Sequence, residues 1–371
     1  MSDYSERRLV IACGGTGGHL FPGIAVAESW TKGGGEVVLL ISEKEIDALA
    51  AEGYGHLRFE KMASIAMPKP LSPRMIPFLG RFAGSWFSCR RLLKSFRAEA
   101  VLGMGGFTSA APLLAGKWRG LPTFIHESNA IPGRSNKLNA KFARTVLVGF
   151  EECARHFETG HPVEVVGTPV RPSVANRPSR DEAAKFFGVS PEKKTIMVMG
   201  GSQGARRLNE LVAAGLSVFE KAGMQVVHIS GPADYDTVSP AYQKHPGAGV
   251  VKDFCAEIQY AYAAADLAIC RSGASTLTEL AFYELPSILI PYPFAADDHQ
   301  TRNAEIFSVP GAAVLWKQEE LHEGNFSRKI VKLLSDDDHI ASMNRAMEKL
   351  AIPDASAQVC EVIVNQIREG D

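Results

Sequence analysis

The sequence predicts an α/β protein made of two Rossmann-like, doubly wound domains that face a shared cleft. Three observations support this fold class. The chain has 371 residues, enough for two domains that each bury a core. Short apolar runs alternate with longer helical patterns, which is typical of βαβ units and parallel sheets. Two glycine-rich turns, at 13–19 and 200–205, each follow an apolar run and precede a helical pattern.

The strand candidates are short apolar runs without polar alternation, which suits parallel strands that are covered on both faces. In the first half of the chain they are 9–13, 37–41, 56–61, 100–104, 123–126, 146–148 and 163–166. In the second half they are 195–199, 225–229, 250–251, 267–270, 287–291 and 313–315.

A boundary between the domains is expected near 167–172, where two prolines flank Arg171 and a polar stretch follows. Such a segment is a plausible hinge. We therefore expect an N-terminal domain at 1–168 and a C-terminal domain at 169–371. The last helix, at about 355–368, can pack on either domain, including back on the N-terminal one.

Composition excludes several classes of protein. A net charge of −1 argues against a general nucleic-acid binder, so no nucleic-acid partner is expected. The six cysteines form no C-x-x-C pair and are interpreted as reduced, mostly buried thiols. The chain starts with polar residues and has no run near the roughly 20 apolar residues that cross a bilayer. We expect a soluble protein, or one that lies on a membrane surface.

The first glycine-rich turn meets the dinucleotide-binding pattern G-x-G-x-x-G only in part. Gly15 and Gly17 fit, but Leu20 stands in place of the third glycine. Glu43, after the second strand candidate, would be the ribose-binding acid if the chain were a dehydrogenase. The P-loop pattern G-x-x-x-x-G-K-[ST] is missing from the sequence, which argues against a P-loop kinase.

His19 follows this turn at the expected start of a helix. The helix dipole disfavours the cationic form of an imidazole there, which suits a neutral general base. The alternative is that His19 only caps the helix, and the residues alone leave both interpretations open.

The segment 270–303 is the richest in site-like residues. A strand ends at Cys270, Ser272 and Gly273 make a turn, and Ser275 or Thr276 is expected to cap the next helix. Amides and hydroxyls at a helix N-terminus suit a diphosphate, and Glu279, one turn on, suits the two hydroxyls of a ribose. The alternative is an ordinary capping box, which explains Thr276 and Glu279. It does not explain the polar cluster at 297–303.

Six motifs, in order along essentially the whole chain, resemble the MurG family, the peptidoglycan N-acetylglucosaminyltransferases of the two-domain GT-B fold. They are Gly14-Gly15-Thr16-Gly17-Gly18-His19, Gly103-Met104-Gly105-Gly106-Phe107, His126-Glu127-Ser128-Asn129, Gly167-Thr168-Pro169-Val170-Arg171, Gly200-Gly201-Ser202-Gln203-Gly204, and Arg271-Ser272-Gly273-Ala274 with Glu279. Each motif alone is weak, and the six together are specific.

The resemblance implies an inverting transferase that moves N-acetylglucosamine from UDP-GlcNAc to the 4-hydroxyl of the undecaprenyl-linked acceptor lipid I, forming lipid II. On the donor side it implies contacts from Arg171, Ser202, Cys255, Ala274, Ser275, Thr276, Leu277, Thr278, Glu279, Gln300 and Asn303. On the acceptor side it implies contacts from Thr16, Gly17, Gly18 and Asn129. His19 is the favoured base, and Glu127 is a second candidate that either acts as base or orients another group.

The resemblance implies no cofactor and no essential metal. Asp234-Tyr235-Asp236 matches the Asp-x-Asp pattern that holds a metal in other transferases. It lies in a polar loop, and we interpret it as turn and helix-cap chemistry, with a metal role as the alternative. Two residues depart from the family: Phe107 replaces a frequent tyrosine, and His299 precedes Gln300 where paired glutamines are usual.

The segment 61–98 contains no acidic residue and several basic ones, with aromatic and aliphatic side chains between them. This composition suits an anionic membrane surface, and the alternative is a core helix with a solvated basic face. A lipid-linked acceptor favours the membrane, so we expect a peripheral protein on the cytoplasmic face of the cell membrane. Proteins of cell-wall synthesis and cell division are expected partners.

Two other functions remain open at this point. A UDP-GlcNAc 2-epimerase has a similar architecture but does not need the basic aromatic segment. A nucleotide-sugar-binding protein without turnover is the alternative from a different class.

Overall fold

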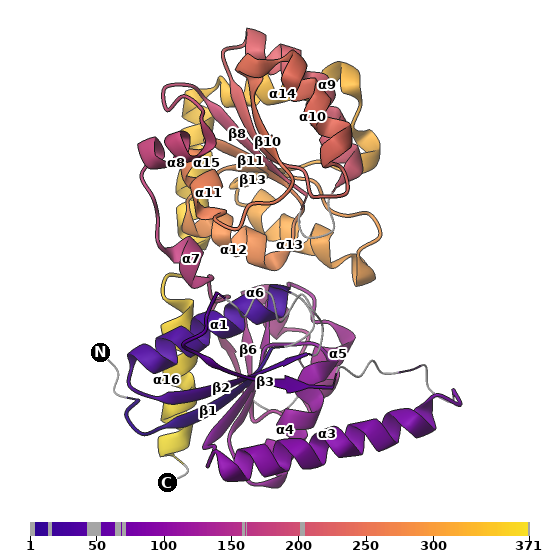
Figure 1. The fold of residues 1–371 in the computed structure, drawn as a ribbon, viewed down its shortest axis with the longest axis vertical. Coiled ribbons are helices and arrows are strands. Elements are labelled where there is room, and N and C mark those ends of the chain that lie inside the picture. Colours follow the sequence, from indigo (N-terminus) through magenta and orange to yellow (C-terminus); the bar gives the residue numbers. More distant parts are fainter. Residues whose placement is uncertain are drawn as a thin grey trace. The chain divides into compact units, whose positions relative to one another are not determined.

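The computed structural model describes residues 4–13, 17–42, 53–63, 68, 72–157, 160, 162–200 and 205–369. The chain forms two compact units (Figure 1). Unit 1 contains Met1–Pro172 and Asp354–Asp371, and unit 2 contains Ser173–Pro353. The chain thus passes from unit 1 to unit 2 and returns to unit 1 with its last helix.

Unit 1 is built on a seven-stranded sheet with the order β3-β2-β1-β4-β5-β6-β7. All of its strand pairs are parallel. The strands are β1 (Arg8–Ala12), β2 (Glu36–Ser42), β3 (Arg58–Met62), β4 (Ala100–Gly103), β5 (Thr123–Glu127), β6 (Thr145–Val148) and β7 (Val163–Val165).

Helices cover both faces of this sheet (Figure 1). They are α1 (Gly17–Lys32), α3 (Met75–Ser95), α4 (Ala110–Trp118), α5 (Arg134–Asn139), α6 (Glu151–Ala154) and α16 (Ala355–Arg368), with a 3-10 turn η1 (Phe107–Ser109). Leu9 and Ile11 of β1 belong to the core beneath α1 and α16. Val10 and Ala12 belong to the core that also holds buried residues of α3 and α4. Burial on both faces explains the continuous apolar run of β1.

The last helix, α16, packs against α1, at the opposite end of the sequence (Figure 1). Val359, Ile363 and Ile367 recur at intervals of four residues and lie buried in the core of unit 1. The Cys360 thiol points at the carbonyl of Val26, with 3.8 Å between sulfur and oxygen. The amphipathic stripe of α16 therefore completes the core of unit 1.

Unit 2 repeats the design with a six-stranded parallel sheet of order β10-β9-β8-β11-β12-β13. The strands are β8 (Thr195–Met199), β9 (Gln225–Ile229), β10 (Gly249–Lys252), β11 (Leu267–Cys270), β12 (Ser287–Leu289) and β13 (Ala313–Leu315). The helices are α7 (Pro172–Ala175), α8 (Arg180–Phe187), α9 (Arg206–Lys221), α10 (Tyr235–Lys244), α11 (Gln259–Ala264), α12 (Ala274–Phe282), α13 (His299–Ser308), α14 (Glu323–Leu334) and α15 (Asp337–Leu350), with 3-10 turns η2 (Pro246–Ala248), η3 (Ala296–Asp298) and η4 (Gln318–Glu320).

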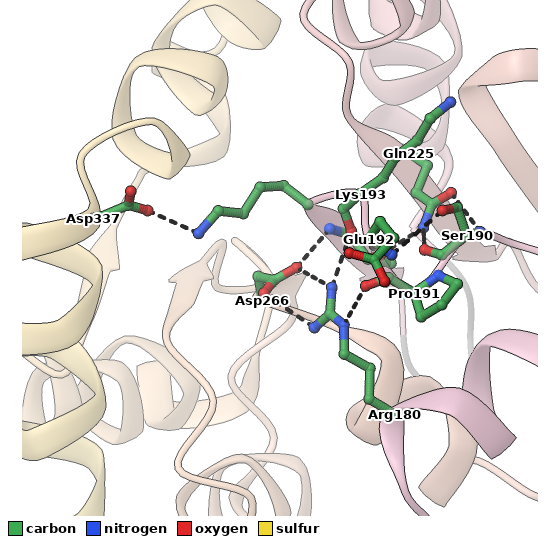
Figure 2. A network of polar contacts seen from close by, with 10 residues as sticks. Arg180, Ser190, Pro191, Glu192, Lys193, Gln225, Asp266 and Asp337 are labelled. Atoms are coloured by element: carbon green, nitrogen blue, oxygen red, sulfur yellow. Dashed lines mark hydrogen bonds and ion pairs between the residues drawn. The ribbon is translucent and has the colours of Figure 1, made fainter.

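A polar network joins the amino ends of three strands of unit 2 (Figure 2). Arg180 donates two hydrogen bonds to the Asp266 carboxylate, at 3.1 and 2.9 Å. The backbone N–H of Thr195, which begins β8, donates to the same carboxylate at 2.7 Å. The Gln225 side chain, at the start of β9, accepts a hydrogen bond from the Ser190 N–H. These contacts tie α8 and the loop before β8 to the amino ends of the strands, at the end of the sheet away from the start of α12.

In each sheet two neighbouring central strands lead in opposite directions: the chain continues to one edge of the sheet after the first and to the other edge after the second. These strands are β1 and β4 in unit 1, and β8 and β11 in unit 2. In such open sheets ligands bind outside the carboxyl ends of the strands at this point, where the strand order reverses. The predicted fold class is confirmed, because each strand candidate coincides with a strand of the structure to within a few residues at its ends.

Candidate active site

His19 lies in the first turn of α1, at the switch point of the unit 1 sheet. Its ring packs against the backbone of Gly105, in the turn that follows β4. A Cβ added at Gly105 would lie 2.8 Å from both Cδ2 and Nε2 of His19, and Gly105 has φ of +120°. Only glycine readily adopts this positive φ and leaves the space free for the ring. The glycine-rich turn after β4 thus makes room for the imidazole.

Glu127, the last residue of β5, is buried and accepts four hydrogen bonds. The backbone N–H and the side-chain amide of Asn129 both donate to Oε1, each at 2.9 Å. The Gly133 N–H and the Asn136 amide donate to Oε2, at 3.1 and 2.9 Å. Since both oxygens are held by N–H groups, this geometry suits a carboxylate that orients its surroundings better than one that takes a proton.

Asn136 connects Glu127 to the pocket of His19. Its Nδ2 lies 3.3 Å from the position that a Gly105 Cβ would take, and it also donates to the His126 carbonyl at 3.1 Å. Burial lowers the pKa of His126, whose ring Nε2 contacts the Gly167 carbonyl at 2.8 Å. Asn136 on α5 therefore lies near the same Gly105 turn as the His19 ring and binds the end of β5, and His126 contacts the segment that leads out of unit 1.

Gly17, Gly18 and Asn129, which are also expected on the acceptor side, lie at the same edge of the sheet. Gly17 and Gly18 form the start of α1, and Asn129 is half-buried beside Glu127. Arg171, which is expected on the donor side, has its guanidinium 4.9 Å above the ring of Phe21, which is on α1. Thr16 lies outside the described residues.

In unit 2 the turn between β11 and α12 lies at the corresponding switch point. α12 begins at Ala274 with Gly273 as its N-cap and with no side-chain cap. The expectation that Ser275 or Thr276 caps this helix is therefore wrong, because both are already inside its first turn. The N–H groups of a first turn have no partner within the helix, so they are the donors that suit an anion.

Two residues of α13, Gln300 and Asn303, form hydrogen bonds with this turn. Ser272 is buried, and its hydroxyl donates to the Gln300 carbonyl at 2.7 Å. The buried Asn303 amide donates to the Ser272 carbonyl at 3.1 Å. The Gln300 Oε1 accepts the Tyr292 N–H at 2.9 Å. Gln300 and Asn303, two members of the polar cluster that a capping box did not explain, thus bind the β11–α12 turn.

Glu279, on the second turn of α12, is buried, and its Oε2 accepts a hydrogen bond from the Tyr262 hydroxyl at 2.7 Å. Leu277 is also buried, so its side chain belongs to the core. Its N–H already donates to the Gly273 carbonyl. The Thr278 hydroxyl donates to the Ala274 carbonyl at 3.0 Å. Ala274 is buried, whereas Ser275 and Thr276 are half-exposed at the helix start.

Cys255 lies in the connection from β10 to α11, and burial raises the pKa of its thiol. Ser202 lies outside the described residues, as does most of the second glycine-rich turn. Asp234 is the N-cap residue of α10, but its side chain makes no cap hydrogen bond. Its Oδ2 accepts the Asn209 amide at 2.8 Å instead, which corrects the cap interpretation. Among the described residues there is no cluster of three metal-ligating side chains.

Two residues of these sites were missed in the sequence. Asn136 occurs in a short polar stretch with no pattern that distinguishes it. Tyr262 occurs among small residues on α11, and its large side chain there was the one available signal.

Models of glycosyltransferase family 28 match both units: the N-terminal domain at residues 9–148 and the C-terminal domain at 195–359. The chain belongs to glycosyltransferase family 28. The resemblance predicted from the six motifs is confirmed. A family 28 relative from Desulforudis audaxviator is 35% identical over 365 residues, covering 96% of this chain and 97% of its own. One from Geobacter metallireducens is 35% identical over 370 residues, covering 98% and 99%. Both are named UDP-N-acetylglucosamine--N-acetylmuramyl-(pentapeptide) pyrophosphoryl-undecaprenol N-acetylglucosamine transferase.

A solved structure agrees with this membership. MurG of Acinetobacter baumannii superposes with a TM-score of 0.75 at 25% identity, covering 97% of this chain and 99% of its own. The UDP-GlcNAc 2-epimerase of Neisseria meningitidis gives a TM-score of 0.70 at 12% identity, covering 96% and 100%. At that identity the epimerase shares the fold alone, whereas the transferases of family 28 share the sequence over nearly its full length.

Proposed function

We propose that this family 28 chain transfers N-acetylglucosamine from UDP-GlcNAc to the 4-hydroxyl of lipid I, with inversion at the anomeric carbon, and so makes lipid II. The observation that carries the proposal is the match over nearly the full length, at 35% identity, to relatives that are named for this transfer. The same relatives favour a transferase over an epimerase.

Unit 2 is the donor side of this proposal. The N–H groups at the start of α12 bind the diphosphate, Glu279 accepts the ribose hydroxyls, and the backbone near Cys255 meets the uracil. Gln300 and Asn303 bind the sugar. The buried position of Glu279 supports its role as the ribose ligand, because a carboxylate in a water-poor site makes strong hydrogen bonds to hydroxyl donors. The helix N-terminus also stabilises the charge that develops on the departing diphosphate.

Unit 1 is the acceptor side, and His19 is its general base. Inversion needs one displacement: the 4-hydroxyl oxygen attacks the anomeric carbon, the bond to UDP breaks, and the hydroxyl proton passes to the base. The packing of the His19 ring on Gly105 supports its role as the base, since a base must be held in place. Glu127 orients the pocket through Asn136.

The surface around α3 is the proposed membrane contact. Cys89 and Leu93 are its buried residues, whereas Ile76 is 79% and Phe87 59% exposed. Trp118 of α4 is 68% exposed, and its ring meets Trp86 edge-on at 5.6 Å. The guanidinium of Arg90 lies 4.9 Å above the Trp86 ring. Exposed aromatic rings beside basic side chains suit anionic lipid headgroups. No described helix is both long and apolar enough to span a bilayer.

This membrane contact would bring the enzyme to the cytoplasmic leaflet, where a lipid-linked acceptor is available. Cell-wall and cell-division proteins are the partners that such a location would offer.

The direct test mixes purified protein with UDP-GlcNAc and a lipid I analogue and follows UDP release. We expect release that requires the acceptor, together with a disaccharide product. Release without acceptor would favour an epimerase or a hydrolase, and no release would favour a binding protein without turnover.

A further inference from the structure

Tyr262 is a buried tyrosine, 2% exposed, whose hydroxyl meets the carboxylate of Glu279 at 2.7 Å. We propose that Tyr262 is a positioning residue for the nucleotide: it holds the Glu279 carboxylate in the orientation that accepts both ribose hydroxyls. This inference rests on the proposed function, since it takes Glu279 as the ribose ligand.

The carboxylate needs such a partner. Glu279 is 3% exposed, and a buried carboxylate is costly unless donors compensate its charge. The last torsion of a glutamate side chain is broad, so the carboxylate plane is poorly fixed by the chain itself. A hydrogen bond to Oε2 from a hydroxyl in a fixed place selects one orientation. A vicinal diol can then meet the carboxylate in a defined geometry.

The hydroxyl is in a fixed place because the ring around it is packed. Tyr262 shares a narrow apolar crevice with Met197 and Cys270 of the central strands and with Leu280 of α12. Its ring also packs against Tyr283, with 5.2 Å between ring centres. The sheet and α12 therefore set the position of the hydroxyl, independently of any loop.

Tyr262 also lies on a helix that follows the proposed uracil side in the chain. Its helix α11 follows the connection that contains Cys255, the proposed uracil side, and its hydroxyl reaches Glu279 on α12, the proposed ribose side. Tyr262 thus joins the helix that follows the proposed uracil side to the proposed ribose ligand. A merely structural hydrogen bond would stabilise unit 2 but would not affect how the protein distinguishes ribose from its deoxy forms.

The test compares the binding of UDP with that of 2′,3′-dideoxyuridine diphosphate by calorimetry. We expect the parent protein to bind UDP more tightly than the dideoxy compound. Tyr262→Phe is expected to weaken UDP binding about tenfold, the effect of one hydrogen bond to a charged group. The affinity for the dideoxy compound is expected to change much less, so the ratio of the two affinities shrinks.

Tyr283→Phe is the matched control. It removes a hydroxyl from the same ring pair, but that hydroxyl donates to the Val174 carbonyl at 3.0 Å, away from Glu279. It is expected to lower the melting temperature and to keep the parent's affinity ratio. The positioning role would be overturned if Tyr283→Phe lowered the ratio of the UDP affinity to the affinity for the dideoxy compound. It would also be overturned if Tyr262→Phe kept the parent's ratio.

A double variant keeps the test valid if Tyr262→Phe folds poorly, since Glu279→Gln removes the buried charge. In the Glu279→Gln background, Tyr262→Phe is expected to cost no further UDP affinity. A second loss of about tenfold there would mean that Tyr262 acts other than through Glu279. If the parent does not bind UDP, or if Glu279→Gln keeps the parent's ratio of affinities, the donor-site proposal itself fails. These outcomes differ from those that overturn the role of Tyr262 alone, so the two failures are distinguishable.

Discussion

The imidazole of His19 fills the space that a side chain at Gly105 would need. A Cβ at Gly105 would stand 2.8 Å from His19 Nε2, closer than two such atoms can approach. We predict that Gly105→Ala displaces the ring and lowers kcat about 100-fold, because a displacement near 1 Å is enough for such a loss. Steady-state kinetics with a soluble lipid I analogue would measure it.

Gly120→Ala is the control for backbone strain. Gly120 also has a positive φ, of +74°, but nothing lies within 4 Å of its missing Cβ. Both variants are expected to lose about 1–2 kcal/mol of stability to strain, and Gly120→Ala is expected to keep its kcat. Full activity in Gly105→Ala would mean that the position of the His19 ring does not matter for catalysis.

His19 and Glu127 are expected to differ in how they affect the pH profile of kcat. His19→Ala is predicted to lower kcat by about 10²–10⁴ and to remove the acidic limb of the profile. Glu127→Gln is predicted to reduce kcat less and to keep the acidic limb. Its amide cannot accept hydrogen bonds at both ends, so melting temperature falls as well. An acidic limb lost in Glu127→Gln and kept in His19→Ala would make Glu127 the base.

Asp266 is predicted to stabilise unit 2 without affecting nucleotide binding. Its carboxylate accepts hydrogen bonds from Arg180 and from the Thr195 N–H (Figure 2). Asp266→Ala should cost about 1–3 kcal/mol, because it leaves these donors without their acceptor. Lys194→Ala is the control, since it breaks an exposed ion pair with Asp337 and should cost about 1 kcal/mol or less. Urea unfolding with and without UDP would separate stability from binding, and weaker UDP binding by folded Asp266→Ala would contradict the prediction.

Stability is predicted to fall as the pH drops below 6.5. Burial lowers the pKa of His228 from 6.5 to about 3, and burial lowers the pKa of His126 as well. Between these values the unfolded chain binds a proton at His228 that the folded protein does not. The contribution of neutral His228 to the free energy of unfolding is therefore fully present above pH 6.5. It is lost as the pH falls towards 3, at about 1.4 kcal/mol per pH unit.

His228→Gln is expected to flatten this dependence, whatever it does to stability at neutral pH. The measurement is the free energy of unfolding between pH 7 and pH 4, with the exposed His339→Gln as the matched control. An unchanged slope in His228→Gln would show that His228 does not account for the acid sensitivity.

Binding to lipid vesicles is predicted to depend on the charge of α3. Arg81→Glu and Lys94→Glu should each weaken binding to anionic vesicles by about 1 kcal/mol per unit of charge, and added salt should weaken binding by the parent. Arg328→Glu, on α14 of unit 2, changes the same charge on an exposed residue elsewhere. Equal binding of the parent to neutral and anionic vesicles would remove the electrostatic part of the proposal.

The strands were predictable because each is a short apolar run that the parallel sheet buries on both faces. β1 shows this, since Leu9 and Val10 enter opposite cores. The last helix was predictable from its apolar stripe, but the stripe alone does not say which core it completes. That choice depends on the surface left uncovered beside α1, which is a property of the folded unit.

The site was predictable where backbone shape limits the residue type. Gly105 was identified as part of the motif at 103–107, one of the six that carry the resemblance to the family. The cap of α12 was predicted wrongly, since hydroxyl residues inside a first turn resemble caps in the sequence. Asn136 could not be found, and Tyr262 offered only its large side chain as a signal, because their hydrogen bonds join residues that the chain pattern does not relate.

The most direct test of the account is a crystal structure with UDP bound. We predict that UDP lies in unit 2, with its diphosphate at the start of α12, its ribose on Glu279 and the Tyr262 hydroxyl still on that carboxylate. UDP found in unit 1 beside His19, with Glu279 unoccupied, would contradict the assignment of the donor side and the roles built on it.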